Sequence, residues 1–322
     1  MFITTMTSMT VNAILPERSA VNSAEGRTSA ARMKTGETNE FQNETGCMTW
    51  PYKHYPLERA LEGISRAGYR YVSLGLPHEG KPVFDYVAKG ESARTLRMLE
   101  KYGLEPVSWI STDALALQHP IERALQRMDF VKAIGVDELL SQGMSSYRRF
   151  PNDPMSDEEL KPLYEAFNAK YRLIGEEAEK RGLVVTIKPH TGNTATAQTI
   201  ADTLSEIASP GVRASYDAGN VRYYEGVDPA VDFPLISAHT VSFIAKDHLG
   251  ARAESNFPVP GEGEVNFPAM IAELKRVSFC GSVIVERVDG TEARLEVEEI
   301  DVRVARAKTN LERMMAETGF EI

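Results

Sequence analysis

The sequence predicts a single (β/α)8 barrel over residues 43–322, preceded by a flexible N-terminal extension over residues 1–42. Three observations predict this fold class: amphipathic helices alternate with short strands, a glycine separates helix from strand in most repeats, and the strands number eight. Alternating strands and helices form a parallel sheet, and eight strands close it into a barrel. An open doubly wound sheet is the alternative, but no Gly-x-Gly-x-x-Gly follows the first strand.

The N-terminal extension is rich in Ser, Thr, Asn, Ala and Met and has no sustained hydrophobic period. Met6, Met9 and Met33 are further possible start sites within it. No basic region followed by an apolar core of signal-peptide length occurs there. We therefore expect a flexible tail, or in part an over-long start, with a role in oligomer contacts as the alternative.

The strands are predicted where short stretches of β-branched and aromatic residues follow a glycine. Glycine suits the left-handed position after a helix. These glycines are Gly68, Gly103, Gly135, Gly182, Gly211 and Gly281. The predicted strands are 45–49, 70–74, 105–110, 137–142, 183–188, 212–217, 239–246 and 282–286.

The helices are predicted from apolar residues that recur at spacings of three and four. In the clearest case Ser156 and Glu159 form a capping box at the start of the helix. Its apolar stripe is Leu160, Leu163, Phe167, Tyr171, Ile174 and Ala178, and similar stripes begin at Leu57, Ile121, Ile200, Phe267 and Val304. We interpret the Met and aromatic members of these stripes as core residues.

Composition excludes several classes of function. The net charge of -10 and the absence of a basic cluster make nucleic acid an unexpected partner. The apolar runs have only the length of strands, so no membrane span is expected. Cys47 and Cys280 fall on the first and last predicted strands. We predict that both are reduced core residues of a cytoplasmic protein.

Four charged residues stand at the ends of consecutive predicted strands: Lys188, Asp217, Lys246 and Glu286. The C-terminal ends of the strands converge on one face of a barrel, so these side chains are expected to meet. Buried charges are costly unless they are paired or face a ligand. Either they pair with one another or they bind a ligand, and four of them together favour a functional site.

Further polar and aromatic candidates flank these strand ends. His190 and His248 directly follow strands and either bind substrate or are hydrogen-bonded structural residues. Trp50 either stacks on a sugar or belongs to the core, and Asn220 either binds a substrate hydroxyl or shapes a turn. The stretch 260–267 contains two glycines before a helix, but its glutamates would repel a phosphate, so we expect a shaped loop.

Over about residues 45–318 the sequence resembles the sugar phosphate isomerase/epimerase superfamily. These xylose isomerase-like barrels also include hydroxypyruvate isomerase, ketose 3-epimerases and endonuclease IV. The acidic charge and the lack of a His-rich metal pattern argue against the endonuclease. The resemblance rests on Gly46-Cys-Met-Thr-Trp50, Lys188-Pro-His190, Asp217-Ala-Gly-Asn220, Lys246-Asp247, the Gly261–Phe267 loop and Glu286.

The resemblance implies one divalent metal, held by Glu, Asp, His and Glu residues on strands 5 to 8. Asp217 and Glu286 match two of these ligands, whereas Lys188 and Ile244 occupy the other two positions. The family's substrate-binding His on strand 6 is Asn220 here. A Mn, Mg, Zn or Co ion on Asp217 and Glu286, completed by His190 or His248, is therefore one expectation. The other expectation is that a lysine ammonium takes the place of the metal.

The resemblance also implies proton abstraction next to the carbonyl of a sugar or keto-sugar, by an isomerase or epimerase. Our hypothesis makes Glu286 the general base, Asp217 a second acid/base or orienting group and Lys188 the electrophile. A Schiff base at Lys188 is a variant that needs a lowered pKa. Lys246, His190 and Asn220 would bind the substrate. The alternatives are a lyase or hydrolase acting on an oxidised sugar, and a non-catalytic sugar-binding or partner subunit. A homodimer is a further expectation from the resemblance.

Overall fold

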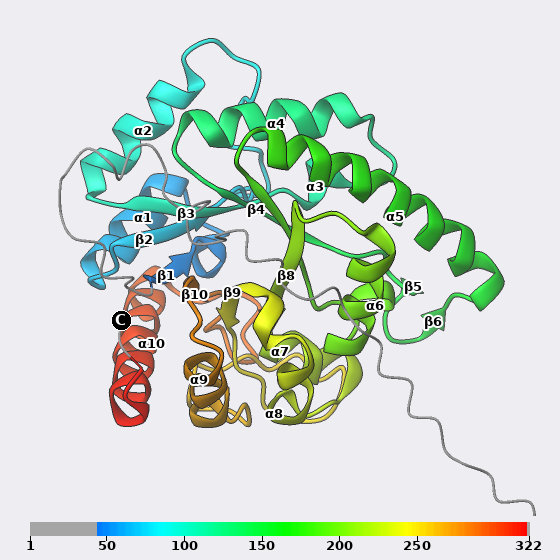
Figure 1. Cartoon of the computed structure of the whole chain (residues 1–322). Coiled ribbons are helices and arrows are strands. Elements are labelled where there is room, and N and C mark those ends of the chain that lie inside the picture. The colour runs from blue at the N-terminus through cyan, green and yellow to red at the C-terminus, as the bar shows by residue number, and fades with distance from the viewer. Residues whose placement is uncertain (1–43, 321–322) are drawn as a thin grey trace, which may run out of the picture. The chain divides into compact units, whose positions relative to one another are not determined.

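The computed structural model of the chain describes residues 44–320, and the extension predicted over residues 1–42 lies outside them. Eight parallel strands form a closed barrel in the order β1-β10-β9-β8-β7-β4-β3-β2. Figure 1 shows the strands at the centre with the helices around them. The predicted (β/α)8 barrel is therefore confirmed, and the open sheet is not formed.

Every predicted strand is present, and no observed bound differs from its prediction by more than one residue. The barrel strands are β1 Glu44–Met48, β2 Tyr71–Leu74, β3 Glu105–Ile110, β4 Glu138–Gln142, β7 Val184–Lys188, β8 Val212–Asp217, β9 Thr240–Ala245 and β10 Ser282–Val285. Period-two alternation places every second side chain of a strand in the barrel lumen. This alternation decides which residues can reach the mouth.

The helices surround the sheet. The longer ones are α1 Leu57–Arg66, α2 Glu91–Tyr102, α4 Ile121–Ala133, α5 Asp157–Lys180, α6 Ala197–Ile207, α9 Phe267–Arg276 and α10 Val297–Thr318. The shorter ones are α3 Thr112–Leu115, α7 Ala218–Asn220 and α8 Pro229–Asp232. No helix within residues 44–320 has both the length and the apolar character needed to cross a membrane.

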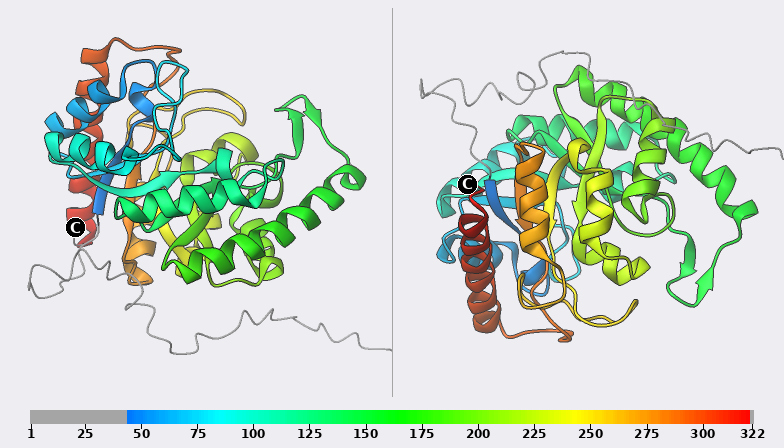
Figure 2. Two further views of the ribbon diagram at one scale, coloured as in Figure 1. Left: turned by 90° about the horizontal axis from the view of Figure 1, so that it is seen from above. Right: turned by 60° about the horizontal axis from the view of Figure 1, so that its bottom comes forward.

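The short helices α3, α7 and α8 were not predicted, and neither was a hairpin that precedes α5. After β4 the chain forms a two-stranded hairpin of β5 Tyr147–Arg149 and β6 Asp153–Pro154, which extends away from the barrel (Figure 2). Its strands are too short to produce a period-two pattern in the sequence. The hairpin leads directly into α5, where the predicted capping box is confirmed: the Ser156 backbone amide donates to the Glu159 carboxylate at 2.9 Å.

The apolar core has two parts. The larger part packs the outer faces of the strands against the helices. The smaller part lies in the lumen, where Met48, Leu140, Ile244 and Ile284 contact one another. Further toward the N-terminal ends of the strands, Glu138 accepts hydrogen bonds from Thr186 and Ser242, both at 2.6 Å. The lumen is therefore filled with side chains below the strand ends.

The prediction for the cysteines holds in part. Cys47 is fully buried in β1, and no disulfide joins it to Cys280. Cys280, however, is exposed, so its prediction as a core residue is wrong. The predicted strand and β10 both begin at Ser282, so Cys280 lies outside the strand, in the segment that connects α9 to it.

A hydrogen bond next to Gly63 joins the segment after β1 to α10. Its atoms leave no room for a side chain at position 63. The hydroxyl of Tyr52 donates to Asp301 at 2.7 Å, and a Cβ on Gly63 would lie 2.3 Å from that hydroxyl. We expect Gly63→Ala to destabilise the fold by about 1–3 kcal/mol, because the overlap outweighs the better helix propensity of Ala. Urea unfolding measures this, with Glu62→Ala on the exposed face of α1 as control. A stabilised Gly63→Ala variant would contradict the prediction.

Candidate active site at the carboxyl ends of the strands

The barrel brings together the four charged residues that the sequence placed at strand ends. Lys188 ends β7, Asp217 ends β8, Lys246 follows β9 and Glu286 follows β10. These four strands are consecutive neighbours in the sheet. The four residues are buried, with exposed fractions of 3%, 0%, 3% and 7%.

Their side chains form a closed set of ion pairs, which we call the charged ring (Lys188, Asp217, Lys246 and Glu286). Lys188 Nζ lies 2.7 Å from Asp217 Oδ2 and also pairs with Glu286 Oε2. Lys246 Nζ lies 2.8 Å from Glu286 Oε1 and 3.0 Å from Asp217 Oδ2. Each ammonium thus contacts both carboxylates, and the two positive charges balance the two negative ones.

The ring keeps Lys188 and Glu286 ionised. Burial lowers the pKa of Lys188, but the charges of Asp217 and Glu286 outweigh burial and hold this pKa above its usual value. Burial raises the pKa of Glu286, but Lys188 and Lys246 outweigh it and hold this pKa below its usual value. A protonated amine is not a nucleophile, so the ring does not favour a Schiff base at Lys188.

The donor set does not fit a divalent metal. Lys188 occupies one of the four metal-ligand positions that the family resemblance implies. Its ammonium contacts Asp217 and Glu286, the two carboxylates that would remain as ligands. Ile244, at another of these positions, packs in the lumen against Met48 and Ile284. Within the described range 44–320, no three or more His, Cys, Asp and Glu side chains are arranged to hold a metal ion.

His190 lies beside the ring on the loop that follows β7. Its ring centroid is 4.1 Å from that of Tyr224, and its Nδ1 is 3.4 Å from Thr191 Oγ1. Burial, together with the nearby charges of Lys188 and Lys246, lowers the pKa of His190 to about 4. The imidazole is therefore neutral at pH 7 and can accept or donate one hydrogen bond to a ligand.

Asn220 and Trp50 have different surroundings. The Asn220 side-chain amide donates to Pro189 O at 2.7 Å, and its backbone amide donates to Asp217 Oδ1 at 2.9 Å. Its turn-shaping role is therefore observed, and its role as a substrate ligand stays a prediction. Trp50 is half-buried after β1 and packs on the lumen cluster, while the ammonium of Lys53 lies 4.3 Å from its ring centroid. Stacking of Trp50 on a sugar also stays a prediction.

His248 is fully buried, and its Nε2 lies 2.8 Å from Glu254 O. This contact is the structural alternative that the sequence left open. Its Nδ1 has no hydrogen-bond partner among residues 44–320. A role for His248 in binding substrate therefore depends on Nδ1 and remains a prediction.

The stretch 260–267 is a shaped loop, as predicted. Asp247 is fully buried beneath it, and the backbone amides of Gly261 and Gly263 donate to its Oδ2 at 2.9 and 2.8 Å. The amides of His248 and Val265 donate to Oδ1 at 2.8 and 3.0 Å. These amides are already satisfied by a carboxylate, so they do not form a phosphate cradle. Asp247 instead anchors the loop next to Lys246.

Sequence reasoning missed the aromatic residues near the ring. Tyr223 and Tyr224 lie in a π-helical turn, Val221–Glu225, that follows the Asp217–Asn220 motif. Phe150 of the hairpin packs against both rings, at 5.5 and 5.0 Å between centroids. Phe257 lies 5.6 Å from Lys246 Nζ and 3.7 Å from the guanidinium of Arg287. The one signal in the sequence for these aromatic residues was that Tyr223 and Tyr224 closely follow the Asp217–Asn220 motif.

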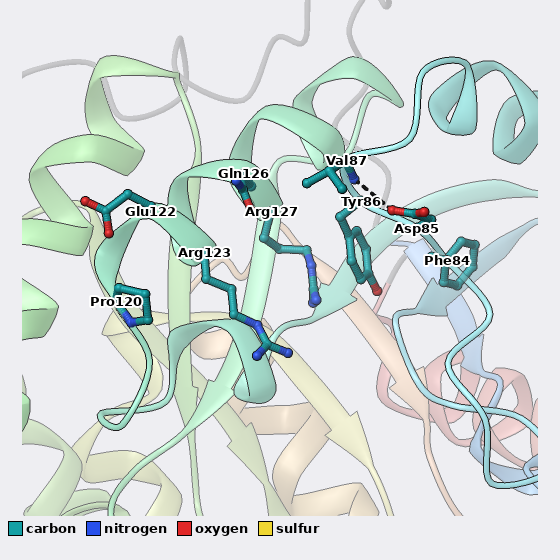
Figure 3. Close-up of a pocket in the computed structure, with 9 residues that line it drawn as sticks. All are labelled: Phe84, Asp85, Tyr86, Val87, Pro120, Glu122, Arg123, Gln126 and Arg127. Atoms are coloured by element: carbon teal, nitrogen blue, oxygen red, sulfur yellow. Dashed lines mark hydrogen bonds between the residues drawn. The ribbon is translucent and has the colours of Figure 1, made fainter.

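A separate cleft of about 430 Å³ lies between the loop after β2 and α4 (Figure 3). Arg127 reaches into its wall, with its guanidinium 3.5 Å from the ring centroid of Tyr86 and in an ion pair with Asp113 at 3.0 Å. No member of the charged ring lines this cleft. Its contacts hold the loop after β2 against α4.

Comparisons with known proteins agree with the fold and with the sequence resemblance. The sequence model of the xylose isomerase-like TIM barrel family matches residues 61–308. The chain is 25% identical to the rhizopine catabolism protein MocC of Rhizobium meliloti over 302 residues, which is 83% of this chain and 84% of that protein.

Solved structures share the barrel at low sequence identity. A D-allulose 3-epimerase from Methylomonas sp. has a TM-score of 0.64 at 18% identity, covering 86% of this chain and 100% of that one. An L-ribulose 3-epimerase has a TM-score of 0.64 at 13% identity, covering 86% and 97%. A xylose isomerase domain protein from Planctomyces limnophilus has a TM-score of 0.65 at 15% identity, covering 86% and 99%.

A closed parallel barrel with its polar cluster at the carboxyl ends of the strands is the arrangement of a TIM-barrel enzyme. The chain belongs to the xylose isomerase-like TIM barrel family. The predicted membership in the superfamily of xylose isomerase-like barrels is thereby confirmed.

Proposed function

We propose that the protein is an isomerase or epimerase of a sugar or keto-sugar that takes a proton from the carbon next to a carbonyl. The observation that carries the proposal is the charged ring, which places two carboxylates and two ammonium groups in a buried site at the strand ends. Proton abstraction from such a carbon needs a base and a stabiliser for the oxyanion that develops. The ring contains both kinds of group.

In the proposed reaction, Glu286 is the base and Lys188 the electrophile. In the free protein Glu286 is a weak base because two ammonium groups contact it. A carbonyl oxygen that accepts a hydrogen bond from Lys188 draws this ammonium away from Glu286, and the carboxylate becomes more basic. Glu286 then takes the proton from the α-carbon; the electron pair of the C–H bond forms a C=C bond, and the carbonyl π pair moves to the oxygen to give an enediolate. Transfer of the hydroxyl proton from one enediolate oxygen to the other, with return of the first proton to the former carbonyl carbon, completes an isomerisation. Return of the proton to the opposite face of the α-carbon completes an epimerisation.

Asp217 acts as an orienting group in this proposal. Its Oδ1 caps the turn through Asn220, and its Oδ2 contacts both lysines, so neither oxygen is left for substrate. Lys246 and His190 are proposed to bind substrate hydroxyls. Trp50, Phe257 and Tyr224 offer apolar faces for the C–H groups of a sugar. A solved neighbour, the Methylomonas sp. D-allulose 3-epimerase, holds D-allulose in one of its structures, which supports a ketose as the class of substrate.

Two other functions use the same site. A lyase acting on an oxidised sugar begins with the same proton abstraction and then expels a β-leaving group, so the substrate decides between the two outcomes. A non-catalytic sugar-binding subunit is the third candidate, and the altered metal ligands favour it. A proton-exchange assay distinguishes this non-catalytic subunit from the two enzymes.

The test is exchange of the α-proton of keto-sugars in heavy water, followed by NMR. The wild-type protein is expected to exchange this proton, whereas Glu286→Gln should exchange it at least about 10²-fold more slowly, because an amide cannot take the proton. Glu298→Gln, on the exposed face of α10, is the matched control. Exchange by Glu286→Gln at the wild-type rate would refute Glu286 as the base. No exchange by wild type with any ketose of a broad panel would favour the binding subunit.

A further inference from the structure

We propose that the ammonium groups of Lys188 and Lys246 together take the place of the divalent metal, so that the protein carries its own dication and binds two neighbouring substrate oxygens with it. The metal part of this inference is independent of the proposed reaction. The part that concerns the substrate rests on the proposed function, because it defines the substrate as an α-hydroxy carbonyl compound.

The first observation that supports the proposal is the net charge of the ring. Each ammonium contacts both carboxylates, so the ring as a whole is neutral. Adding a divalent cation would leave two uncompensated positive charges in a site whose residues are at most 7% exposed. Such charge is strongly unfavourable away from water. The ring therefore excludes a divalent ion as long as both lysines are present.

The second observation is that the two lysine Nζ atoms lie next to the same carboxylate oxygen. Lys188 Nζ and Lys246 Nζ lie 2.7 and 3.0 Å from the same oxygen, Asp217 Oδ2. Both also contact Glu286, one at each carboxylate oxygen. The two ammonium groups are thus held side by side by a shared pair of carboxylates, which is how two metal-ligand carboxylates hold one cation.

The third observation is the hydrogen-bonding capacity of the lysines. An ammonium has three N–H donors, and the hydrogen bonds of the ring use two on Lys188 and one on Lys246, whose contact with Asp217 is an ion pair. At least one donor of each lysine is left for a ligand. Two adjacent donors match two adjacent oxygens, as in an α-hydroxy ketone and in the enediolate that it forms. A single carbonyl without a neighbouring hydroxyl would engage only one of them.

The surroundings of the ring agree with a site that holds no metal. Ile244 packs in the lumen with Met48, Leu140 and Ile284, so the position of the family's His ligand contributes to the core instead. Phe257 lies 5.6 Å from Lys246 Nζ, and an aromatic face favours an ammonium over a metal ion that needs oxygen or nitrogen ligands.

The first experiment measures Mn²⁺, Co²⁺ and Zn²⁺ on the purified full chain, by elemental analysis after dialysis and by calorimetric titration. Wild type is expected to hold less than one-tenth equivalent of each metal and to show no titratable site below about 1 mM. One equivalent of any of them in wild type would overturn the proposal. Because this measurement needs no substrate, it gives the same answer whether or not the protein exchanges protons.

The second experiment restores the ligands. Lys188→Glu combined with Ile244→His is expected to bind Mn²⁺ at least tenfold more tightly than Lys188→Met, which removes the charge but adds no ligand. Equal affinity of the two folded variants would show that Lys188 does not occupy a metal position and would overturn the proposal. If the double variant does not fold, Lys188→Glu alone gives the same comparison, and the wild-type measurement still decides.

The third experiment tests the two-oxygen contact with hydroxyacetone, a neutral compound whose carbonyl and hydroxyl oxygens are adjacent. Lys188→Met and Lys246→Met are each expected to weaken hydroxyacetone binding at least tenfold, and Lys89→Met, on an exposed loop, is expected to leave it unchanged. If only one of the two lysine variants weakened ligand binding, the proposal that both lysines bind the ligand together would be overturned. If both variants weakened binding but the wild type exchanged no protons, the lysine pair would be established and the proposed reaction would be refuted instead.

Discussion

Lys188→Met is expected to lower the rate of α-proton exchange by about 10²- to 10³-fold. The variant keeps the volume of the side chain but removes the positive charge that we place at the developing oxyanion, and loss of such a group typically costs two to three orders of magnitude. Glu286 keeps its contact with Lys246 and loses its contact with Lys188, which makes the carboxylate more basic and offsets a part of the loss. Exchange kinetics in heavy water, expressed per mole of folded protein, measure the effect.

The same substitution leaves two buried carboxylates facing one ammonium. We therefore expect Lys188→Met to destabilise the fold by about 3–5 kcal/mol as well, as for other buried pairs that lose one partner. Circular dichroism and thermal unfolding separate this loss of stability from the loss of rate. Exchange within about tenfold of wild type in a folded Lys188→Met variant would rule out Lys188 as the electrophile.

Asp247→Asn is expected to destabilise the protein by about 4 kcal/mol, although the residue does not belong to the charged ring. Both Asp247 oxygens accept two backbone amides each, on a side chain that is fully buried. The amide nitrogen of Asn would face two donors without an acceptor, and each buried unsatisfied group costs about 1–3 kcal/mol. Urea unfolding gives the free energy.

Asp228→Asn is the matched control for this variant, because Asp228 is exposed and caps the short α8 through one amide, Ala230 N, at 3.0 Å. A loss below about 0.5 kcal/mol is expected for the control. If Asp247→Asn were as stable as this control, Asp247 would not be the anchor of the 260–267 loop.

The barrel could be predicted from sequence because its signals are local. Helix stripes, stop glycines and strand composition repeat along the chain, and the prediction placed both ends of β3 and β8 correctly. The hairpin of β5 and β6 was missed because its strands span three and two residues. Cys280 was misplaced because it lies two residues before the predicted strand 282–286, in a connecting segment where its side chain is exposed.

The candidate site was partly predictable for a topological reason. Parallel strands in a barrel end on one face, so Lys188, Asp217, Lys246 and Glu286 had to meet once the strands were assigned. The aromatic residues near the ring were not predictable, because Phe150 and Tyr224 come from segments that are far apart in the sequence and their contact depends on how the loops pack.

The sequence by itself determined the barrel and the four charges at its mouth, because periodicity sets the elements and closure sets which strand ends converge. Only the tertiary structure decided that these charges pair with one another. Whether Lys188 contacts a carboxylate, a metal or solvent depends on side-chain distances of a few ångströms, and Coulomb energies in a buried site change steeply over such distances. Residue spacing along the chain does not contain that information.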